Sequence, residues 1–503
     1  MNKFINAIVG SLVVVLLAAC SSDAQSDPEN ELKDVVEETA ATEVEENEVI
    51  AVEDLEDRDY GGLTLTWAGP SRSIDPEASE VKEKWFDRIK ALEEKWNFKF
   101  EPKEIPYDSM VGDYIRTTLA GDPIGDIVYI HAFNFYPAFP DNGLAYPVSD
   151  LDVVDFDNPK WVQSARKSSE YKGKTYSIRP GSTETVIVRD GVWFNKTQFE
   201  NLGIPSLYDL YENGEWTWDK MFEIAELATK DLDNDGVIDV YGFGGNHLPY
   251  DLIYNNGAEA IFKTENGVNV DFNDPRIVEA LEYYQKVHED HARVFLQPAQ
   301  EGGGVDIRSD FRDGRLLMVV NDWWVSTSDL NGGRMKDEYG FVPFPAGPSN
   351  ENPEQPVSVG HDDSMEIMLG TVDKPKEKLE IWDAITDIGT AEDWERWTRE
   401  EYETGANDAE SVEYALLMHQ NVKTNLIFGF GELNGLTRQL FADIASGATT
   451  AQSGLEAVEP QIKAALADFQ EHGIDLGITE EEIEQTKKEL EDGTYGQEKE
   501  EEK

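Results

Sequence analysis

Between residues 63 and 104 the apolar residues change their spacing twice, and this order of patterns restricts the fold of the chain strongly. Residues 63–67 alternate apolar and polar side chains and stop at Gly69-Pro70, which predicts a strand followed by a turn. Apolar residues then recur at spacings of three and four, as on one face of a helix: Val81, Trp85, Ile89, Leu92 and Trp96. Residues 98–104 again read as a strand. A strand, a helix and a strand in this order predict the start of a parallel α/β sheet.

The next segment continues the same organisation. An apolar stretch over residues 114–119 is followed by the turn Gly121-Asp122-Pro123 and by a buried strand over 126–130. No internal repeat of fixed period is visible in the chain, which excludes solenoids and propellers. Apolar residues make up 40% and aromatic residues 11% of the 503 residues, which predicts two or three packed domains.

The charge of the chain restricts its partners. The formal net charge is -59 at pH 7. Such a charge opposes binding to nucleic-acid phosphates or to anionic lipid head groups, because like charges repel, and it favours cations and neutral ligands. We therefore expect no nucleic-acid partner and a solvated acidic surface suited to a saline or alkaline exterior.

The single cysteine, Cys20, predicts an anchor rather than a disulfide. Lys3 precedes an apolar run that ends in small residues, as in a secretory signal peptide. The sequence Leu17-Ala18-Ala19-Cys20 resembles the lipobox of bacterial lipoproteins, which implies cleavage before Cys20 and lipidation of its thiol, for example with palmitate. An uncleaved membrane helix with an incidental cysteine is the alternative. Residues 21–59 contain 16 acids and two bases, which predicts an extended tether.

A short acidic loop predicts a metal site. In the sequence DLDNDGVID, residues 231–239, acids alternate as in the first positions of an EF-hand loop, and Gly236 occupies the sixth position. Calcium is a hard cation that binds six to eight oxygens, and alternate acids on a tight turn supply several of them. The expected ligands are these side chains and one carbonyl: Asp231, Asp233, Asp235, Val237 (carbonyl) and Asp239. Position 12 is Gly242 rather than a bidentate glutamate, and a solvated acidic turn is the alternative.

Six blocks of the chain together carry a resemblance: LAGDPIGDIVYI (119–130), YKGKTYSIRP (171–180), VWFNKTQFENLGI (192–204), WTWDKMFEIAELAT (216–229), FRDGRLLMVVNDWW (311–324) and YGFVPFPAGP (339–348). In this collinear order they resemble the bacterial extracellular solute-binding proteins of sugar-type ABC importers, the family 1 group of maltose-binding proteins. In the fourth block, Thr217 is also placed to cap a helix whose apolar face begins with Met221 and Phe222.

The resemblance implies a two-lobe, periplasmic-binding-protein-like α/β fold of type II, with central mixed sheets and hinged lobes that close over a ligand. The chain is expected to cross between the lobes near residues 181–185 and 358–364. The resulting organisation is a signal peptide (1–19), an anchor and acidic tether (20–59), a first lobe (60–180 plus 361–405), a second lobe with C-terminal helices (186–357 plus 406–479) and an acidic tail (480–503). Other members of the family have a calcium loop in the place of residues 231–239, where the ion is structural.

Residues at strand ends and crossings are candidates for the ligand site. Sugars present apolar faces and many hydroxyls, so their sites combine aromatic rings with hydrogen-bonding side chains. Ligands of open α/β sheets bind where strands end. The residues selected on these grounds are Trp67, His131, Asn134, Tyr136, Glu184, Asp322, Trp323, Trp324, His361 and Asp362. Core packing or capping competes with ligand binding for each of them, and either Trp323 or Trp324 resembles the stacking residue of the family.

No catalytic motif is found in the sequence, so an enzyme is not predicted. The chain has no Gly-x-Ser-x-Gly motif, and the glycines 302–304 lack the lysine of a phosphate-binding loop. His288 and His291 have a spacing of three rather than the four of a zinc protease, which indicates an ordinary helix surface.

The predicted function is that of a monomeric, lipid-anchored protein on the extracellular face of the membrane. It captures a carbohydrate, such as an oligosaccharide, and delivers it to the permease subunits of an ABC importer. A secreted carbohydrate-active enzyme, a calcium-stabilised surface adhesin, and a binding protein for a peptide or another polar solute are the alternatives. The choice of cargo depends on loop geometry, which the sequence leaves open.

Overall fold

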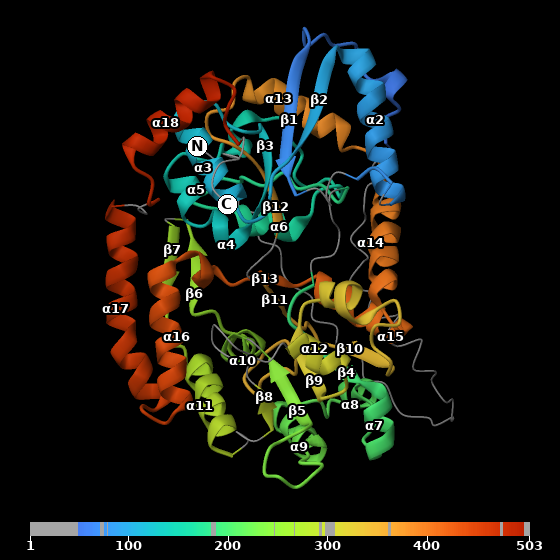
Figure 1. Ribbon diagram of the computed structural model, residues 1–503, viewed down its shortest axis with the longest axis vertical. Coiled ribbons are helices and arrows are strands. Elements are labelled where there is room, and N and C mark those ends of the chain that lie inside the picture. The colour runs from blue at the N-terminus through green and yellow to red at the C-terminus, as the bar shows by residue number, and fades with distance from the viewer. Residues whose placement is uncertain are drawn as a thin grey trace, which may run out of the picture. The chain divides into compact units, whose positions relative to one another are not determined.

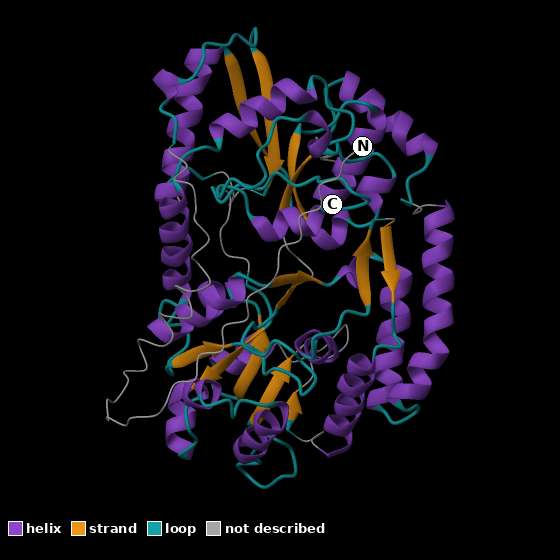
Figure 2. Ribbon diagram, turned by 180° about the vertical axis from the view of Figure 1, so that it is seen from behind, coloured by secondary structure: helices purple, strands orange, loops and turns teal. Residues whose placement is uncertain are grey.

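The computed structural model describes residues 49–70, 75–77, 79–182, 188–245, 247–265, 267–290, 294–296, 307–360, 364–472 and 476–496. They belong to the compact unit Glu46–Lys503. The unit is an α/β structure in which strands are gathered into sheets and flanked by helices (Figures 1 and 2). Within the described part of the chain, no helix combines the length and the apolar character needed to span a membrane.

The first sheet has the strand order β12-β3-β1-β2. Its strands are β1 (Leu63–Gly69), β2 (Phe98–Glu104), β3 (Ile127–His131) and β12 (Ser364–Met368). Strand β1 pairs in parallel with β2 and with β3, whereas β12 is antiparallel to β3. The predicted strands of residues 63–67, 98–104 and 126–130 and their parallel arrangement are thus confirmed. We call this sheet and its helices the first lobe.

Helix α2 shows how the sequence produces the first lobe. Ser79 begins the helix by accepting a hydrogen bond from the backbone N–H of Lys82, and Asn97 ends it in the left-handed conformation, with φ of 51°. The predicted apolar face is buried and carries Trp85 and Leu92, both fully buried. The helices and short turns of this lobe are η1 (Val52–Asp54), α2 (Glu80–Trp96), α3 (Met110–Ala120), α4 (Ala132–Phe135), α5 (Ala138–Asp141), η3 (Val148–Leu151), α6 (Gln163–Ser169) and α13 (Pro375–Ile385).

The second sheet has the strand order β10-β4-β9-β5-β8. Its strands are β4 (Gly191–Asn195), β5 (Tyr241–Gly245), β8 (Phe295–Leu296), β9 (Leu316–Asn321) and β10 (Tyr339–Val342). It is a mixed sheet, because β4 is antiparallel to β9 and β10 while β5 is parallel to β8 and β9. This sheet and its helices form the second lobe.

In the second lobe, helix α9 begins and buries its apolar face where the sequence predicts. As predicted, Thr217 caps α9 by accepting a hydrogen bond from the N–H of Lys220, and Met221 and Phe222 are fully buried. The other elements of this part are α7 (Lys196–Leu202), α8 (Leu207–Glu212), α9 (Trp218–Ala228), α10 (Leu248–Asn255), the hairpin β6 (Ile261–Thr264) and β7 (Gly267–Val270), α11 (Pro275–Asp290), α12 (Ile307–Arg312) and the π-turn η4 (Ser326–Leu330).

The chain passes between the lobes more than once. It leaves the first lobe after residue 180 and returns before β12. Residues 183–185 and 361–363 of the predicted crossings lie outside the described residues. Beside the return segment, β11 (Ser358–Gly360) pairs in parallel with β13 (Val422–Thr424). The remaining elements are α14 (Ala391–Gly405), α15 (Ala409–His419), η5 (Leu426–Gly429), α16 (Gly431–Ala445), α17 (Ala451–His472) and α18 (Glu480–Glu491).

Helix α14 joins the two lobes. Near its start, Arg396 lies 3.7 Å from Glu80 of α2. Near its end, the ring of Tyr402 lies 5.1 Å from that of Trp323, in the core of the second lobe. The predicted boundary at residues 405 and 406 therefore falls at the end of a helix that packs on both lobes.

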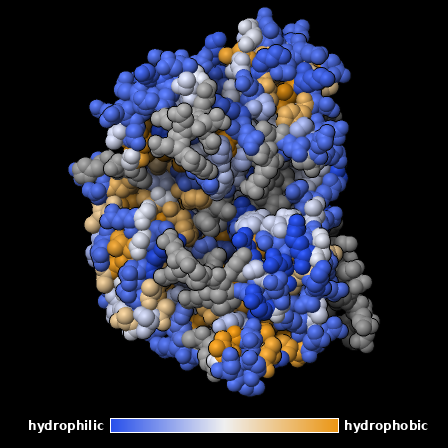
Figure 3. Space-filling model, viewed as in Figure 1, coloured by the Kyte–Doolittle hydropathy of each residue, from blue (hydrophilic) through white to orange (hydrophobic). Residues whose placement is uncertain are grey.

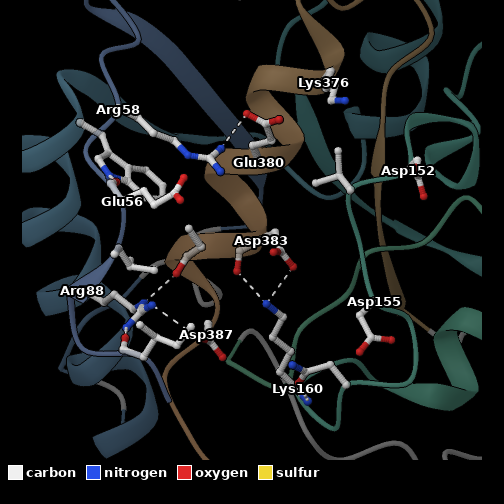
Figure 4. Close-up of a pocket in the computed structure, with 16 residues that line it drawn as sticks. Glu56, Arg58, Arg88, Asp152, Asp155, Lys160, Lys376, Glu380, Asp383 and Asp387 are labelled. Carbon is white, nitrogen blue, oxygen red and sulfur yellow. Dashed lines mark hydrogen bonds and ion pairs between the residues drawn. The ribbon is translucent and has the colours of Figure 1, made fainter. Parts of the chain in front are cut away.

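Both ends of the described chain pack on the first lobe. The predicted tether ends as ordered structure, because Arg88 donates a hydrogen bond to the carbonyl of Ile50 (3.0 Å) and Arg58 pairs with Glu380 (2.9 Å; Figure 4). In the predicted acidic tail, α18 is a capped helix that packs on α3, and Tyr495 donates a hydrogen bond to Asp113 (2.7 Å). The packed body thus extends beyond residues 60–479 at both ends.

The surface is strongly polar, as the composition requires. The face in Figure 3 is mostly hydrophilic, with small apolar patches. Large apolar side chains that are exposed are few among the described residues: Ile50, Tyr107, Leu227, Leu232 and Val237.

A buried ion pair holds the first lobe together. The ammonium of Lys378 on α13 lies 2.6 Å from a carboxylate oxygen of Asp126, and both side chains are almost fully buried. The second oxygen of Asp126 accepts a hydrogen bond from the N–H of Thr66 in β1 (2.8 Å). Asp126 therefore connects β1, the start of β3 and α13.

Replacing Lys378 should destabilise the protein. In Lys378→Met the carboxylate of Asp126 stays buried without its cation, and we expect the free energy of unfolding to fall by about 3 kcal/mol. The measurement is urea unfolding followed by tryptophan fluorescence. Lys376→Met, an exposed position on the same helix, is the matched control and should change stability by less than about 0.5 kcal/mol. Equal effects of the two substitutions would contradict this role of the ion pair.

Candidate functional site

One edge of the second sheet gathers polar side chains from distant parts of the chain. Gly191 at the start of β4 is paired with Asn321 at the end of β9, and Gly245 at the end of β5 is paired with Val320. The residues just beyond these strands therefore lie at one edge. They are Asp190, His247 and Asp322.

Three carboxyl groups meet at this edge. The N–H of Asp190 points at an oxygen of Asp322 (3.4 Å), and His247 Nδ1 lies 3.6 Å from an oxygen of Asp190. Asp251, on α10, is fully buried, and no described group donates a hydrogen bond to either of its oxygens. Burial, followed by the charges of Asp190 and Asp322, raises the pKa of Asp251 well above its ordinary value. The edge thus concentrates hydrogen-bond acceptors in a partly desolvated place.

The two adjacent tryptophans have different environments. Trp323 is buried, with its ring 5.1 Å from Trp193 and 5.0 Å from Phe341. Trp324 is half-buried, and its indole N–H donates a hydrogen bond to Asp322 (2.8 Å). The guanidinium of Arg308 lies 5.5 Å from the Trp324 ring. Trp324, held in place by Asp322 and Arg308, is therefore the ring available for stacking on a ligand.

The first lobe presents an aromatic edge at the end of β3. His131 is paired with Ser364 of β12 and is buried, with its ring stacked on that of Phe133 at 5.6 Å. The ring of Tyr107 also lies 5.6 Å from His131, and the side chain of Tyr107 is 49% exposed. Asn134 follows in α4 and is half-buried. This edge combines ring faces with one amide.

The segment η5 contacts residues of both edges. The ring of Phe428 lies 5.4 Å from His247 in the second lobe. Gly429 lies so close to α4 of the first lobe that a Cβ on it would be 2.3 Å from the carbonyl oxygen of Tyr136. Because only a glycine fits at this contact, η5 fixes the approach of the C-terminal segment to the aromatic edge.

The structure separates the sequence-predicted ligand residues into three groups. His131, Asn134, Asp322 and Trp324 lie at the sheet edges just described. Glu184, His361 and Asp362 lie outside the described residues. The remaining three, Trp67, Tyr136 and Trp323, are core residues.

The three core residues are fixed by their packing. The ring of Trp67 covers Gly69, where a Cβ would come within 2.5 Å of it. Tyr136 is buried and donates its hydroxyl to the carbonyls of Ser168 and Glu170, the latter at 3.0 Å. Their assignment to the ligand site stays a prediction. The structure places all three in the core, because strand ends carry side chains on both faces and one face is the core.

Sequence reasoning missed several residues of the edges: Tyr107, Phe133, Asp190, His247, Asp251 and Phe428. One of them had a usable signal, because Asp251 is a lone acid within the apolar helix LPYDLIYN. An ionisable residue within an apolar helix is costly to bury, because burial disfavours its charged form, and it therefore points to a function. The others are brought to the edges by pairings between distant segments.

The acidic loop between α9 and β5 has a geometry suited to a cation. Carboxylate oxygens of Asp231, Asp233 and Asp239 lie within 4.8 Å of one another. This spacing fits oxygens that share one calcium ion, whose bonds to oxygen are about 2.4 Å long. Asp235 is not part of this group, and its carboxylate accepts a hydrogen bond from the N–H of Val237 (2.8 Å). The donor set is made of hard oxygens only, as calcium prefers.

Comparison with known proteins identifies the family. Residues 78–376, more than half of the chain, match the family described as bacterial extracellular solute-binding protein. The chain belongs to this family. Its members bind solutes, which agrees with the expectation that the chain is not an enzyme. No curated protein matches the sequence.

Solved structures confirm the predicted two-lobe fold of this solute-binding protein. A cyclo/maltodextrin-binding protein complexed with maltotetraose has a TM-score of 0.57 at 14% identity, covering 80% of this chain and 96% of its own. A solute-binding protein from Thermotoga lettingae bound with alpha-D-tagatose has a TM-score of 0.54 at 17% identity, covering 80% and 100%. A substrate-binding protein from Listeria monocytogenes in complex with cycloalternan has a TM-score of 0.53 at 18% identity, covering 81% and 99%.

Asp251 should make the stability of this solute-binding protein depend on pH. Because its pKa is raised in the folded state, the native protein holds a proton that the unfolded chain releases above about pH 4. Its contribution to stability is therefore full below that pH and is lost as the pH rises through the folded-state pKa. We expect Asp251→Asn to raise the free energy of unfolding at pH 7.5 by about 1 kcal/mol or more and to flatten its decline with pH.

The measurement is urea unfolding of both proteins at several pH values between 5 and 8. Asp209→Asn, at an exposed position on α8, is the control and should leave the pH dependence unchanged. A wild-type stability that does not fall faster with pH than that of Asp251→Asn would refute this assignment.

Proposed function

We propose that this solute-binding protein captures a carbohydrate, such as an oligosaccharide, at the edges of its two sheets and delivers it to an ABC importer. The observation that carries the proposal is the pairing of Trp324 with Asp322, beside Asp190 and Asp251, at the carboxyl ends of β5 and β9. A fixed ring beside hydrogen-bond acceptors matches the two surfaces of a sugar, its C–H face and its hydroxyls.

The charge of the edge favours a neutral ligand with many hydroxyls. Carboxylates accept strong hydrogen bonds from hydroxyl groups but repel anions. Asp251 is costly to bury without a donor, and a bound hydroxyl supplies one. The ligands named in the complexes of the similar structures are maltotetraose, tagatose and cycloalternan, all of which are carbohydrates.

The proposed mechanism is binding without chemical change. The lobes are joined by crossing segments and by α14, and a ligand that contacts both sheet edges favours the arrangement in which they are closer. The aromatic edge with His131, Phe133 and Asn134 then completes the site begun by Trp324. Closure presents the loaded form to the permease subunits, and opening releases the sugar.

We propose further that the mature protein is a monomer held on the extracellular face of the membrane through a lipid on Cys20. Cys20 lies outside the described residues. The support for this part is the lipobox sequence and the acidic segment that follows it. The attachment of the described segment from residue 49 onward to the first lobe agrees with a tether that enters there.

Removing the Trp324 ring should weaken carbohydrate binding. We expect Trp324→Ala to lower the affinity for the tightest ligand of an oligosaccharide screen by about tenfold to a hundredfold, because a stacking ring contributes on the order of 1 to 3 kcal/mol. Isothermal titration calorimetry measures the change. Trp324→Phe keeps a ring face and should retain most of the affinity. Phe86→Ala, on α2 far from both edges in sequence and structure, is the control.

Two outcomes would overturn the proposed function. One is that no saccharide binds the folded wild-type protein at millimolar concentration. The other is that Trp324→Ala binds as tightly as the wild type. Release of a chemically altered sugar from the purified protein would contradict the binding mechanism.

We propose that the loop of residues 231–239 binds one structural calcium ion. Asp231, Asp233 and Asp239 supply the carboxylate oxygens, and backbone carbonyls of the loop, with Val237 as the candidate, complete the set. The neighbouring N–H of Gly236 already fixes Asp231 by a hydrogen bond of 2.8 Å. The ion relieves the repulsion of acids that the fold holds together, and so it stabilises the region between α9 and β5.

Calcium should raise the melting temperature. At a free concentration one hundred times the dissociation constant, binding adds about 2.7 kcal/mol to the free energy of unfolding. Differential scanning calorimetry with calcium and with a chelator measures the shift. Asp231→Asn should reduce the shift strongly, whereas Asp209→Asn should not. An identical melting temperature with calcium and with chelator would refute the site.

A further inference from the structure

The fold holds three carboxyl groups close together at the edge of the second sheet. Asp190 precedes β4, Asp322 follows β9, and Asp251 lies on α10. Asp190 and Asp322 are near enough to Asp251 for their charges to act on its carboxyl. Asp190 is 8% exposed and Asp251 is fully buried. Because like charges repel more strongly where water is excluded, the protein without a ligand keeps a proton on Asp251 at neutral pH.

No described cation compensates the carboxyl of Asp251. Its two oxygens accept no hydrogen bond from the described part of the chain, and the charges that act on it are those of acids. Two arginines border the edge. Arg189 is not among the groups that act on Asp251. Arg308 lies 3.9 Å from Asp329 and 5.5 Å from the ring of Trp324. The proton on Asp251 is therefore the only positive charge that the described residues show on this carboxyl.

The segments next to these elements in the sequence contribute acids rather than cations. Residues 183–187, 246, 297–306 and 361–363 lie outside the described residues. Together they contain five acids, one histidine and neither lysine nor arginine. These segments therefore supply no lysine or arginine that could neutralise the carboxyl groups of the edge.

The spacing of the carboxyl groups suits an organic cation better than a metal ion. In the loop of residues 231–239, three carboxylate oxygens lie within 4.8 Å of one another. No three acids or histidines in the described part of the edge come that close. A metal ion needs several oxygens at about 2.0 to 2.6 Å, whereas an ammonium group donates three separate hydrogen bonds to acceptors around it. The edge thus offers acceptors that match an ammonium group.

Trp324 places a ring face beside these acceptors. Its indole N–H donates a hydrogen bond to Asp322 (2.8 Å), which fixes the ring and the carboxylate together. An amino sugar has a C–H face for such a ring, hydroxyl groups for polar side chains and an ammonium group for carboxylates. A neutral sugar also donates hydrogen bonds to these acceptors, but it leaves their charge uncompensated.

We propose that the carbohydrate bound at this edge is an amino sugar, whose ammonium group lies against Asp190 and Asp251. The inference rests on the proposed carbohydrate function and narrows it to a cationic class of ligand. The ammonium group takes over the role of the proton on Asp251. Binding therefore releases this proton, because a nearby cation favours the charged form of a carboxyl group.

Calorimetric titration of the full chain with matched sugars tests the proposal. The pairs are glucosamine with glucose, galactosamine with galactose, and the β-1,4-linked glucosamine dimer with cellobiose, at pH 6, where the amines are protonated. We expect at least one amine to bind about tenfold to a hundredfold more tightly than its neutral partner. N-acetylation, which removes the charge, should abolish this preference. The heat of binding should vary with the ionisation enthalpy of the buffer, as the release of a proton requires.

Two variants test the carboxyl groups. Asp251→Asn and Asp190→Asn keep the size of each side chain and remove its charge, and each should lower the ratio of amine to neutral-sugar affinity about tenfold. Asp251→Asn should also abolish the release of the proton. Asp209→Asn, at an exposed position on α8, is the matched control and should leave the ratio unchanged. Melting curves show that each variant is folded.

The inference and the proposed function fail in different ways. The inference is overturned if no amino sugar binds more tightly than its neutral partner, or if both Asp251→Asn and Asp190→Asn keep the preference of the wild type. Binding of neutral sugars alone would still support the proposed function. If no saccharide of either kind binds, the proposed function is refuted and the inference with it.

Discussion

The first sheet is completed only by a strand that follows the whole second sheet in the sequence, and this constraint shapes the rest of the molecule. Strand β12 (Ser364–Met368) pairs antiparallel with β3, which ends at His131. The chain must therefore leave the first lobe, build the second sheet and return. Each return brings backbone from both lobes together, at β11 and β13 and along α14. The sheet edges depend on these passages, because they lie beside them.

The proposed carbohydrate site carries a cost in stability. At the sheet edge, burial of Asp251 beside Asp190 and Asp322 raises its pKa and lowers stability at neutral pH. Such a cost is tolerated where a ligand later supplies the missing donor.

Local sequence patterns predicted where helices and strands lie. Which residues come together at the candidate site depends instead on pairing between strands that are distant in the sequence. The alternation over residues 63–67 and the spacing from Val81 to Trp96 identified β1 and α2, and Thr217 identified the start of α9, because these features act over a few residues. The sequence could not distinguish Trp323 from Trp324. One ring joins the core around Trp193 and its neighbour does not, and this depends on the register of β4 and β9.

The same dependence on distant contacts explains why the sequence did not predict the ordered structure at the two ends of the described chain. Residues 49–59 and 480–496 are acidic enough to read as solvated chain. Their order comes from single long-range contacts, such as the hydrogen bond from Arg88 to Ile50 and that from Tyr495 to Asp113, for which the local composition gives no sign.

The attachment of both ends of the described chain to the first lobe has a practical consequence for labelling the molecule. A fluorophore or fusion partner joined after α18 is attached to the first lobe, and so is one joined at residue 49. Because both labels are attached to the first lobe, the distance between them would not report the proposed closure of the two lobes. To measure the proposed closure, one label must be placed on the second lobe, for example on the exposed side of α8. The other label can be placed at either end of the described chain.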